Sequence, residues 1–171
     1  MAITLKEKGF ADRIIGVDAN EENLEKAYAL GLIDEGRNMA EAIGLSDLII
    51  RSVPVDALMN MLPSVLDKVD KQVVMEVGST KEKFIASIKD HPKRSRLVAP
   101  PPMAGPASSG PAAAVGDLFT GKSVVLCDIK DSDPDAVELA ERLYETMEMR
   151  KVYMDAAAHD LHTAYVSHIS H

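Results

Sequence analysis

The fold is decided by residues 72–110, QVVMEVGSTKEKFIASIKDHPKRSRLVAPPPMAGPASSG, where two apolar runs each lead into a loop rich in Gly, Ser or Pro. The first run, residues 73–77, is typical of a buried strand and ends in GSTK, where Ser79 or Thr80 can cap a following helix. The second run, residues 97–99, opens into PPPMAG. Because ligands of open α/β sheets bind beyond the carboxyl ends of the strands, we expect both loops to face one crevice.

The same alternation of apolar strands and helical patterns continues in both directions. Further strands are expected at residues 13–18, 47–53, 123–127 and 150–154, and helices at residues 2–8, 21–30, 39–43, 55–69, 112–119 and 136–148. In the helix at 55–69 the side chains expected to face the core are Leu58, Met61, Leu62 and Leu66. Strands that alternate with long helices predict an α/β fold with a doubly wound, mostly parallel sheet.

Composition predicts one globular domain and argues against several classes of partner. The chain has 171 residues, 46% of them hydrophobic, which is enough for a single core. Its 19 Lys and Arg residues against 27 Asp and Glu residues give a net charge of −8, so we expect no nucleic-acid or membrane surface. Cys127, the only cysteine, lies in an apolar run and is expected to be a buried thiol in a reducing compartment, so the cytoplasm is the expected location.

Two charged residues near strand ends leave alternatives open. Asp18 follows an apolar strand, where a carboxylate could accept both hydroxyls of an adenosine ribose, or it could merely cap the next helix. The glycine-rich turn that normally accompanies such an acid is not found before it in this sequence. Arg51 interrupts an apolar run and could either reach out to solvent or contact a ligand or partner.

Histidines are concentrated at the end of the sequence. His159, His162, His168 and His171 fall within thirteen residues, a pattern that suits a solvated helix face. His168 and His171 could share a metal ion, but no Cys or carboxylate completes an evident ligand set, so we expect no metal site.

Six segments together resemble the prephenate dehydrogenase family in their order and spacing. They are RIIGVDAN (13–20), DLIIRSVPV (47–55), VGSTK (77–81), PMAG (102–105), SGPA (109–112) and YVSHISH (165–171). The resemblance implies NAD-dependent oxidative decarboxylation of prephenate, or in some relatives of arogenate, within tyrosine biosynthesis.

The same resemblance implies a domain organisation. Residues 1–154 correspond to a Rossmann-like dinucleotide-binding domain without its first strand and glycine-rich turn. Residues 155–171 correspond to the start of a helix that leads to a helical dimerisation domain. A homo-oligomer is therefore expected.

The resemblance also assigns site residues. It implies that NAD contacts Asp18, Ser52, Val53, Pro54, Gly78 and Ser79. Ser79 would also hydrogen-bond the substrate hydroxyl, and His159, Ser167 and His171 match family residues that line the substrate pocket.

One catalytic position departs from the family pattern. The family has a His directly before the Pro-Met of the second loop, where it takes the substrate's hydroxyl proton, but this chain has Pro101 there. Proline has no acid, base or side-chain donor, so this chain is expected to be inactive. The alternative is a non-catalytic binding or structural module on the same scaffold, natural or engineered.

Overall fold

The structure, a computed structural model, describes residues 1–51, 55–76, 82–99 and 119–158. The loop after the first strand of the 72–110 stretch, the proline-rich loop and most of the expected helices at 112–119 and 155–171 lie outside these ranges.

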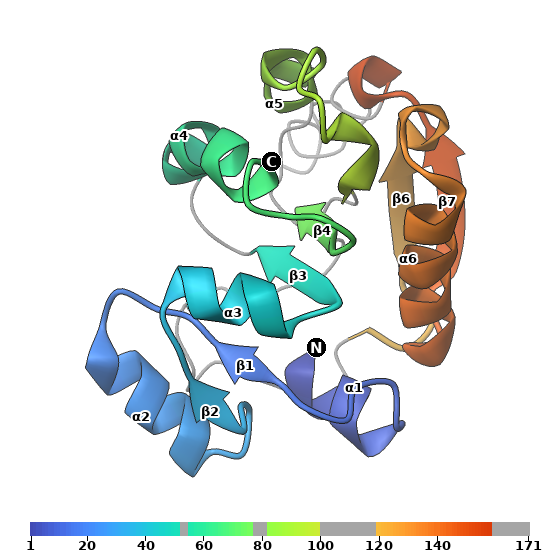
Figure 1. The fold of residues 1–171 in the computed structure, drawn as a ribbon. Coiled ribbons are helices and arrows are strands. Elements are labelled where there is room, and N and C mark those ends of the chain that lie inside the picture. The colour runs from blue at the N-terminus through green and yellow to red at the C-terminus, as the bar shows by residue number, and fades with distance from the viewer. Residues whose placement is uncertain (52–54, 77–81, 100–118, 159–171) are drawn as a thin grey trace, which may run out of the picture.

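Strands and helices alternate along the described chain, as the sequence predicts (Figure 1). The helices are α1 (Ala2–Glu7), α2 (Glu21–Ala29), α3 (Met39–Leu45), α4 (Val55–Leu66), α5 (Glu82–Ser87) and α6 (Pro134–Thr146), with short 3₁₀ turns at Arg94–Arg96 and Ile129–Asp131. The strands are β1 (Ile15–Gly16), β2 (Glu35–Gly36), β3 (Leu48–Arg51), β4 (Val73–Glu76), β5 (Leu97–Val98), β6 (Ser123–Cys127) and β7 (Arg150–Met154).

Local signals explain several of these boundaries. The Asn20 side chain caps α2 by accepting a hydrogen bond from the backbone N–H of Glu22 at 2.9 Å. Gly31 follows α2 at a φ of +68°, a left-handed conformation that glycine adopts without steric cost. Pro134 opens α6, where a missing backbone N–H breaks no helical hydrogen bond.

The sheet is mostly parallel, as expected, and its described strands form three hydrogen-bonded groups. β1 pairs with β2, β3 with β4 and β4 with β5, and β6 with β7, all in parallel. An antiparallel bridge between Ala99 and Cys127 links the end of the β5 segment to β6. No hydrogen-bonded pairing between β1 and β3 is found within the described ranges.

Two hydrophobic cores cover opposite faces of the central strands, because successive strand residues point to opposite sides. Val74 belongs to the core under α4 and α5, and its neighbours Val73 and Met75 belong to the core under α6. Figure 1 shows α4 and α5 on one side of β4 and α6 on the other. Doubly wound packing is thus confirmed.

Individual burial predictions have mixed outcomes. Cys127 is buried, and Leu62 and Leu66 lie in the core, as expected. Met61, expected to face inward, is 40% exposed, so that prediction is wrong. Within the described ranges, every helix is too short or too polar to cross a membrane.

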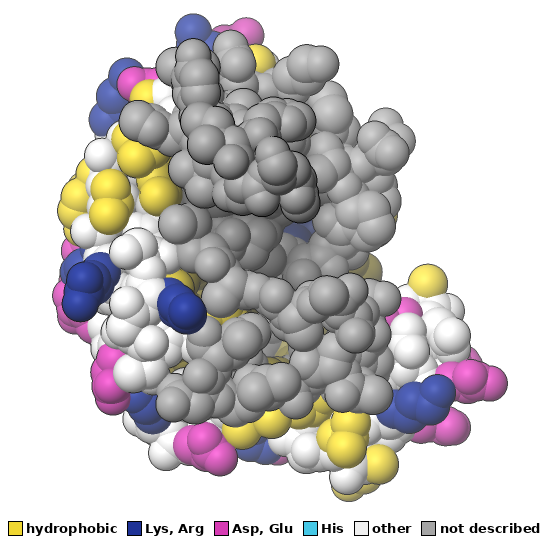
Figure 2. Space-filling model, turned by 180° about the vertical axis from the view of Figure 1, so that it is seen from behind, with side chains coloured by type: hydrophobic (Ala, Val, Ile, Leu, Met, Phe, Trp, Pro, Cys, Tyr) yellow, Lys and Arg dark blue, Asp and Glu magenta, His cyan; other side chains and the backbone are white. Residues whose placement is uncertain are grey.

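The described surface mixes charges of both signs. Figure 2 shows Lys and Arg side chains interspersed with Asp and Glu side chains around the rim of the face seen from behind. Hydrophobic side chains are scattered among them on this face.

Candidate functional site

At the carboxyl edge of the parallel strands, the ends of β3 and β4 lie side by side. β3 and β4 run parallel with Arg51 in register with Glu76, so the last residues of the two strands are direct neighbours. The predicted cofactor residues Ser52, Val53, Pro54, Gly78 and Ser79 follow these two strand ends in sequence, but they lie outside the described residues.

Asp18 lies two residues beyond β1 and is exposed. Its Oδ1 accepts the backbone N–H of Asn20 at 2.8 Å, and its Oδ2 accepts the side-chain amide of Asn23 at 3.2 Å. A carboxylate has about four acceptor positions, so both oxygens can still accept further hydrogen bonds. The carboxylate thus helps to organise the start of α2 and also presents free acceptor positions to solvent, which fits a pair of ribose hydroxyls.

Glycine allows the close packing that places Asp18. A Cβ atom added to Gly16 would lie only 2.6 Å from Cδ1 of Ile33, and one added to Gly36 would lie 3.2 Å from Cδ1 of Leu24. A larger residue at either position would displace the side chain of Ile33 or Leu24, so glycine allows the short strands β1 and β2 to pack closely against them. The sequence analysis did not predict β2, because neither Glu35 nor Gly36 carries an apolar strand signal.

Arg51 is buried rather than extended into solvent, so the solvent-reaching alternative is wrong. Its residue exposure is 4%, and its neighbour Glu76 is fully buried at 0%. Desolvation lowers the pKa of the Arg51 guanidinium, and the charge of Glu76 opposes this shift. Both terminal nitrogens of Arg51, Nη1 and Nη2, are buried and have no hydrogen-bond partner among the described residues.

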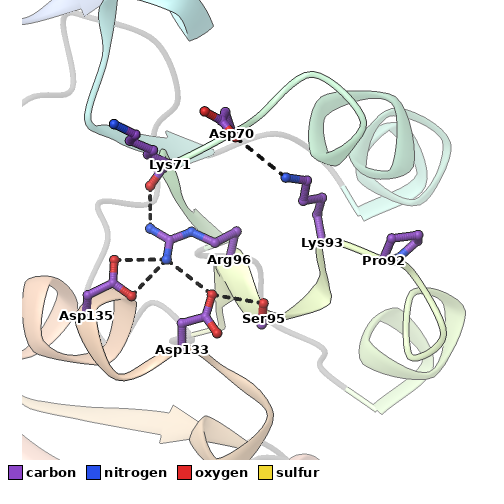
Figure 3. A pocket seen from close by; sticks show the side chains of 8 residues that line it. All are labelled: Asp70, Lys71, Pro92, Lys93, Ser95, Arg96, Asp133 and Asp135. Atoms are coloured by element: carbon purple, nitrogen blue, oxygen red, sulfur yellow. Dashed lines mark hydrogen bonds and ion pairs between the residues drawn. The ribbon is translucent and has the colours of Figure 1, made fainter.

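A hollow of about 440 Å³ lies at the opposite, amino edge of the sheet, where β4 and β5 begin (Figure 3). It is lined by Asp70, Lys71, Pro92, Lys93, Ser95, Arg96, Asp133 and Asp135. This cluster was not predicted from the sequence, because its members come from segments that lie far apart along the chain.

Arg96 holds this amino-edge hollow together. Its Nη1 donates to Oδ1 and Oδ2 of Asp135 at 2.8 and 2.9 Å and to Oδ2 of Asp133 at 3.2 Å. Its Nη2 and Nε donate to the backbone carbonyls of Lys71 and Gln72. The hydrogen bond from Arg96 lowers the pKa of the Asp135 carboxyl. The cluster ties the start of α6 to the starts of β4 and β5, which is a structural task.

The remaining expected site residues lie outside the described ranges. They are Pro101, which occupies the family's base position, and His159, Ser167 and His171, with His162 and His168 beside them. In the part of the chain that is described, no group of three or more His, Cys, Asp or Glu side chains could hold a metal ion.

Comparisons with known proteins agree on one family. Residues 1–153 match the family described as "Prephenate dehydrogenase, nucleotide-binding domain". A prephenate dehydrogenase of Bacillus subtilis (strain 168) is 30% identical over 175 residues, covering 100% of this chain and 47% of that protein. The chain spans about half the length of the curated relatives it matches.

Solved structures give the same result. The crystal structure of prephenate dehydrogenase from Aquifex aeolicus superposes with a TM-score of 0.90 at 31% identity, covering 99% of this chain and 62% of that one. A structure of the A. aeolicus enzyme in complex with hydroxyphenyl propionate and NAD+ superposes with a TM-score of 0.84 at 30% identity, covering 93% and 56% of the two chains.

Proposed function

This chain belongs to the prephenate dehydrogenase family, and we propose that its carboxyl edge forms the NAD-binding half of a prephenate dehydrogenase site. The observation that carries the proposal is the match of residues 1–153 to the family's nucleotide-binding domain. The relative from A. aeolicus that superposes on 93% of this chain is a complex with NAD+. In this proposal residues 1–154 are the dinucleotide-binding domain and residues 155–171 begin the helix toward a helical domain.

Asp18 is the described residue that best fits the cofactor. Its exposed carboxylate retains free acceptor positions beyond β1, where the ribose hydroxyls of an adenosine would lie. A carboxylate there repels a 2′-phosphate, so NAD is preferred over NADP. Ser52, Val53, Pro54, Gly78 and Ser79 complete the proposed cofactor contacts from the ends of β3 and β4.

The proposed reaction is oxidative decarboxylation of prephenate to 4-hydroxyphenylpyruvate, or of arogenate in the same manner. NAD, when bound, would supply the hydride acceptor for the ring carbon that bears the hydroxyl. A base would take the hydroxyl proton as a carbonyl forms there. The ring carboxylate would leave as carbon dioxide with its bonding electrons passing into the ring, and the proton would return to the oxygen of the aromatic product. Ser79 holds the substrate hydroxyl, and His159, Ser167 and His171 line the substrate pocket.

This chain lacks the catalytic base of the family at the corresponding position. Pro101 stands where the family has its proton-accepting His, and proline cannot take a proton. Loss of a general base lowers turnover by about 10²- to 10⁴-fold. Pro101 therefore favours a second candidate function, a non-catalytic binding or structural module on the same scaffold. NADH formation from prephenate would exclude the second candidate, because a module that only binds produces none.

Unpaired strand edges and the single cysteine bear on assembly and location. β1 and β3 each have an edge with no hydrogen-bonded strand among the described residues, and such edges recruit other chains. We therefore propose a homo-oligomer, which sedimentation would detect. Cys127 is the only cysteine and is buried, which suits a reducing compartment such as the cytoplasm.

The cofactor proposal is tested by titrating the protein with NAD and NADP in a calorimeter. Wild type should bind NAD more tightly than NADP. Asp18→Asn should weaken NAD binding about tenfold, because hydrogen bonds to a charged acceptor are lost, and should reduce the difference in affinity between NAD and NADP. Asp12→Asn is the matched control, since Asp12 is also exposed but lies before β1. Equal affinities of wild type for both cofactors, or an unchanged preference in Asp18→Asn, would contradict the proposal.

A further inference from the structure

Arg51 has a combination of features that the proposed cofactor contacts do not use. It is the last residue of β3, it is 4% exposed, and both of its terminal nitrogens are buried without a hydrogen-bond partner among the described residues. A guanidinium stays charged and presents its donors in a planar fork. Buried donors of this kind are rarely left without acceptors, so a bound ligand is expected to supply acceptors to the Arg51 guanidinium.

The position of Arg51 indicates what kind of ligand could supply the acceptors. Arg51 lies on the same face of the sheet as Ile49, which packs against the core under α4 and α5, because alternate strand residues share a face. It also lies at the carboxyl edge, where ligands of open α/β sheets bind. A group bound at the end of β3 would therefore lie beside the Arg51 side chain.

Glu76 explains how the charge is kept at this place. It is in register with Arg51 on the adjacent strand, about 4.8 Å away between backbones, and it is fully buried. Its negative charge offsets the burial of the guanidinium, yet Nη1 and Nη2 remain without acceptors in the described part of the chain. The charge of Glu76 thus favours a charged guanidinium at this place.

We propose that Arg51 binds an oxyanion of the ligand through Nη1 and Nη2, either a phosphate of the dinucleotide or a carboxylate of the substrate. The planar fork of a guanidinium matches both groups through two parallel hydrogen bonds. The assignment rests on the proposed function, which places these ligands at the carboxyl edge.

The test compares three proteins that keep the net charge of wild type. Arg51→Met/Glu76→Met replaces the buried pair by apolar side chains of similar length, a change that proteins commonly tolerate. Arg51→Lys keeps the positive charge but removes the fork. Arg13→Gln/Glu35→Gln is the control, because Arg13, just before β1, and Glu35 in β2 form an ion pair in a strand pair that is not hydrogen-bonded to β3 within the described ranges.

Each protein is titrated calorimetrically with NAD, inorganic pyrophosphate, hydroxyphenyl propionate and adenosine, which has no oxyanion. The double variant at Arg51 and Glu76 should bind adenosine like wild type and lose about tenfold or more in affinity for one class of oxyanion. A loss for NAD and pyrophosphate assigns Arg51 to the cofactor phosphates, and a loss for hydroxyphenyl propionate assigns it to the substrate carboxylate. Arg51→Lys should also lose affinity, and the control should not.

Unchanged affinities for all oxyanions in the double variant would overturn the proposal and make the pair purely structural. Full affinity of Arg51→Lys for the oxyanions would overturn binding through two parallel hydrogen bonds. If the double variant does not fold, the affinity of Arg51→Lys for the oxyanions tests the proposal in its place. If wild type binds pyrophosphate or hydroxyphenyl propionate through Arg51 but not NAD, the cofactor proposal fails while the role of Arg51 stands. If wild type binds none of the probes, both fail.

Discussion

The two edges of the central sheet each bury an arginine, and they treat it in opposite ways. At the amino edge, the terminal nitrogens of Arg96 donate to two carboxylates and a backbone carbonyl, and its Nε donates to a second carbonyl. At the carboxyl edge, Nη1 and Nη2 of Arg51 have no acceptor among the described residues, although Glu76 is beside it. Satisfied donors stabilise the fold, whereas donors without acceptors destabilise it unless a ligand arrives.

This difference separates a structural edge from a functional one. The hollow at the amino edge is an open cavity, yet the guanidinium of Arg96 that lines it already donates to carboxylates and backbone carbonyls. Parallel α/β sheets bind ligands at the other edge, where Asp18 and Arg51 lie. An available donor is therefore a better guide to the site than an open hollow.

The largest expected effect comes from breaking the amino edge. Arg96→Met should lower the free energy of unfolding by about 2–3 kcal/mol, because two backbone carbonyls and two carboxylates lose a charged donor. Urea unfolding followed by circular dichroism measures this. Arg142→Met, an exposed arginine on α6, should change the free energy by no more than about 0.5 kcal/mol. A loss below about 0.5 kcal/mol in Arg96→Met would show that the network contributes little.

A smaller effect is expected on the pH dependence of stability through Asp135. The pKa of Asp135 is lowered in the folded protein by its hydrogen bond with Arg96, so the unfolded chain binds this proton more readily. The stabilisation is complete above the ordinary carboxyl pKa, about pH 4, and is lost as the pH falls through the lower folded value. Asp135→Asn should therefore lower stability slightly at pH 6, and the difference from wild type should shrink toward pH 3.

Because Asp135 is exposed to solvent, this difference is expected to be small and to weaken with salt. Thermal unfolding at both pH values, with and without added salt, provides the measurement. A difference between Asp135→Asn and wild type that stays constant from pH 6 to pH 3 would argue against a lowered pKa.

Much of the fold was predictable because local patterns determine it. The strands at 123–127 and 150–154 are found with the expected bounds, and Asn20 and Gly31 act as the expected start and stop of α2. Strand β2 was missed because its two residues have no apolar pattern and are held by close packing at glycines.

The candidate site was less predictable because its features depend on residues far apart in sequence. Asp18 could be predicted as a candidate cofactor residue from its place after an apolar strand. The structure shows that its carboxylate accepts a backbone hydrogen bond just before α2 and is also exposed to solvent. The burial of Arg51 depends on Glu76, which lies on another strand, so no local pattern around Arg51 indicates it. The Arg96 network likewise joins residues separated by 37 and 39 positions.

The central claim, that ligands bind at the carboxyl edge and that the amino edge is structural, can be tested directly by nuclear magnetic resonance. The backbone amide signals of the protein are followed as NAD is added. The account predicts that the largest shifts fall on residues near Asp18, Arg51 and Glu76, with little change at Ser95, Arg96 and Asp133. Shifts concentrated at the amino-edge hollow, with the strand ends around Asp18 and Arg51 unaffected, would contradict it.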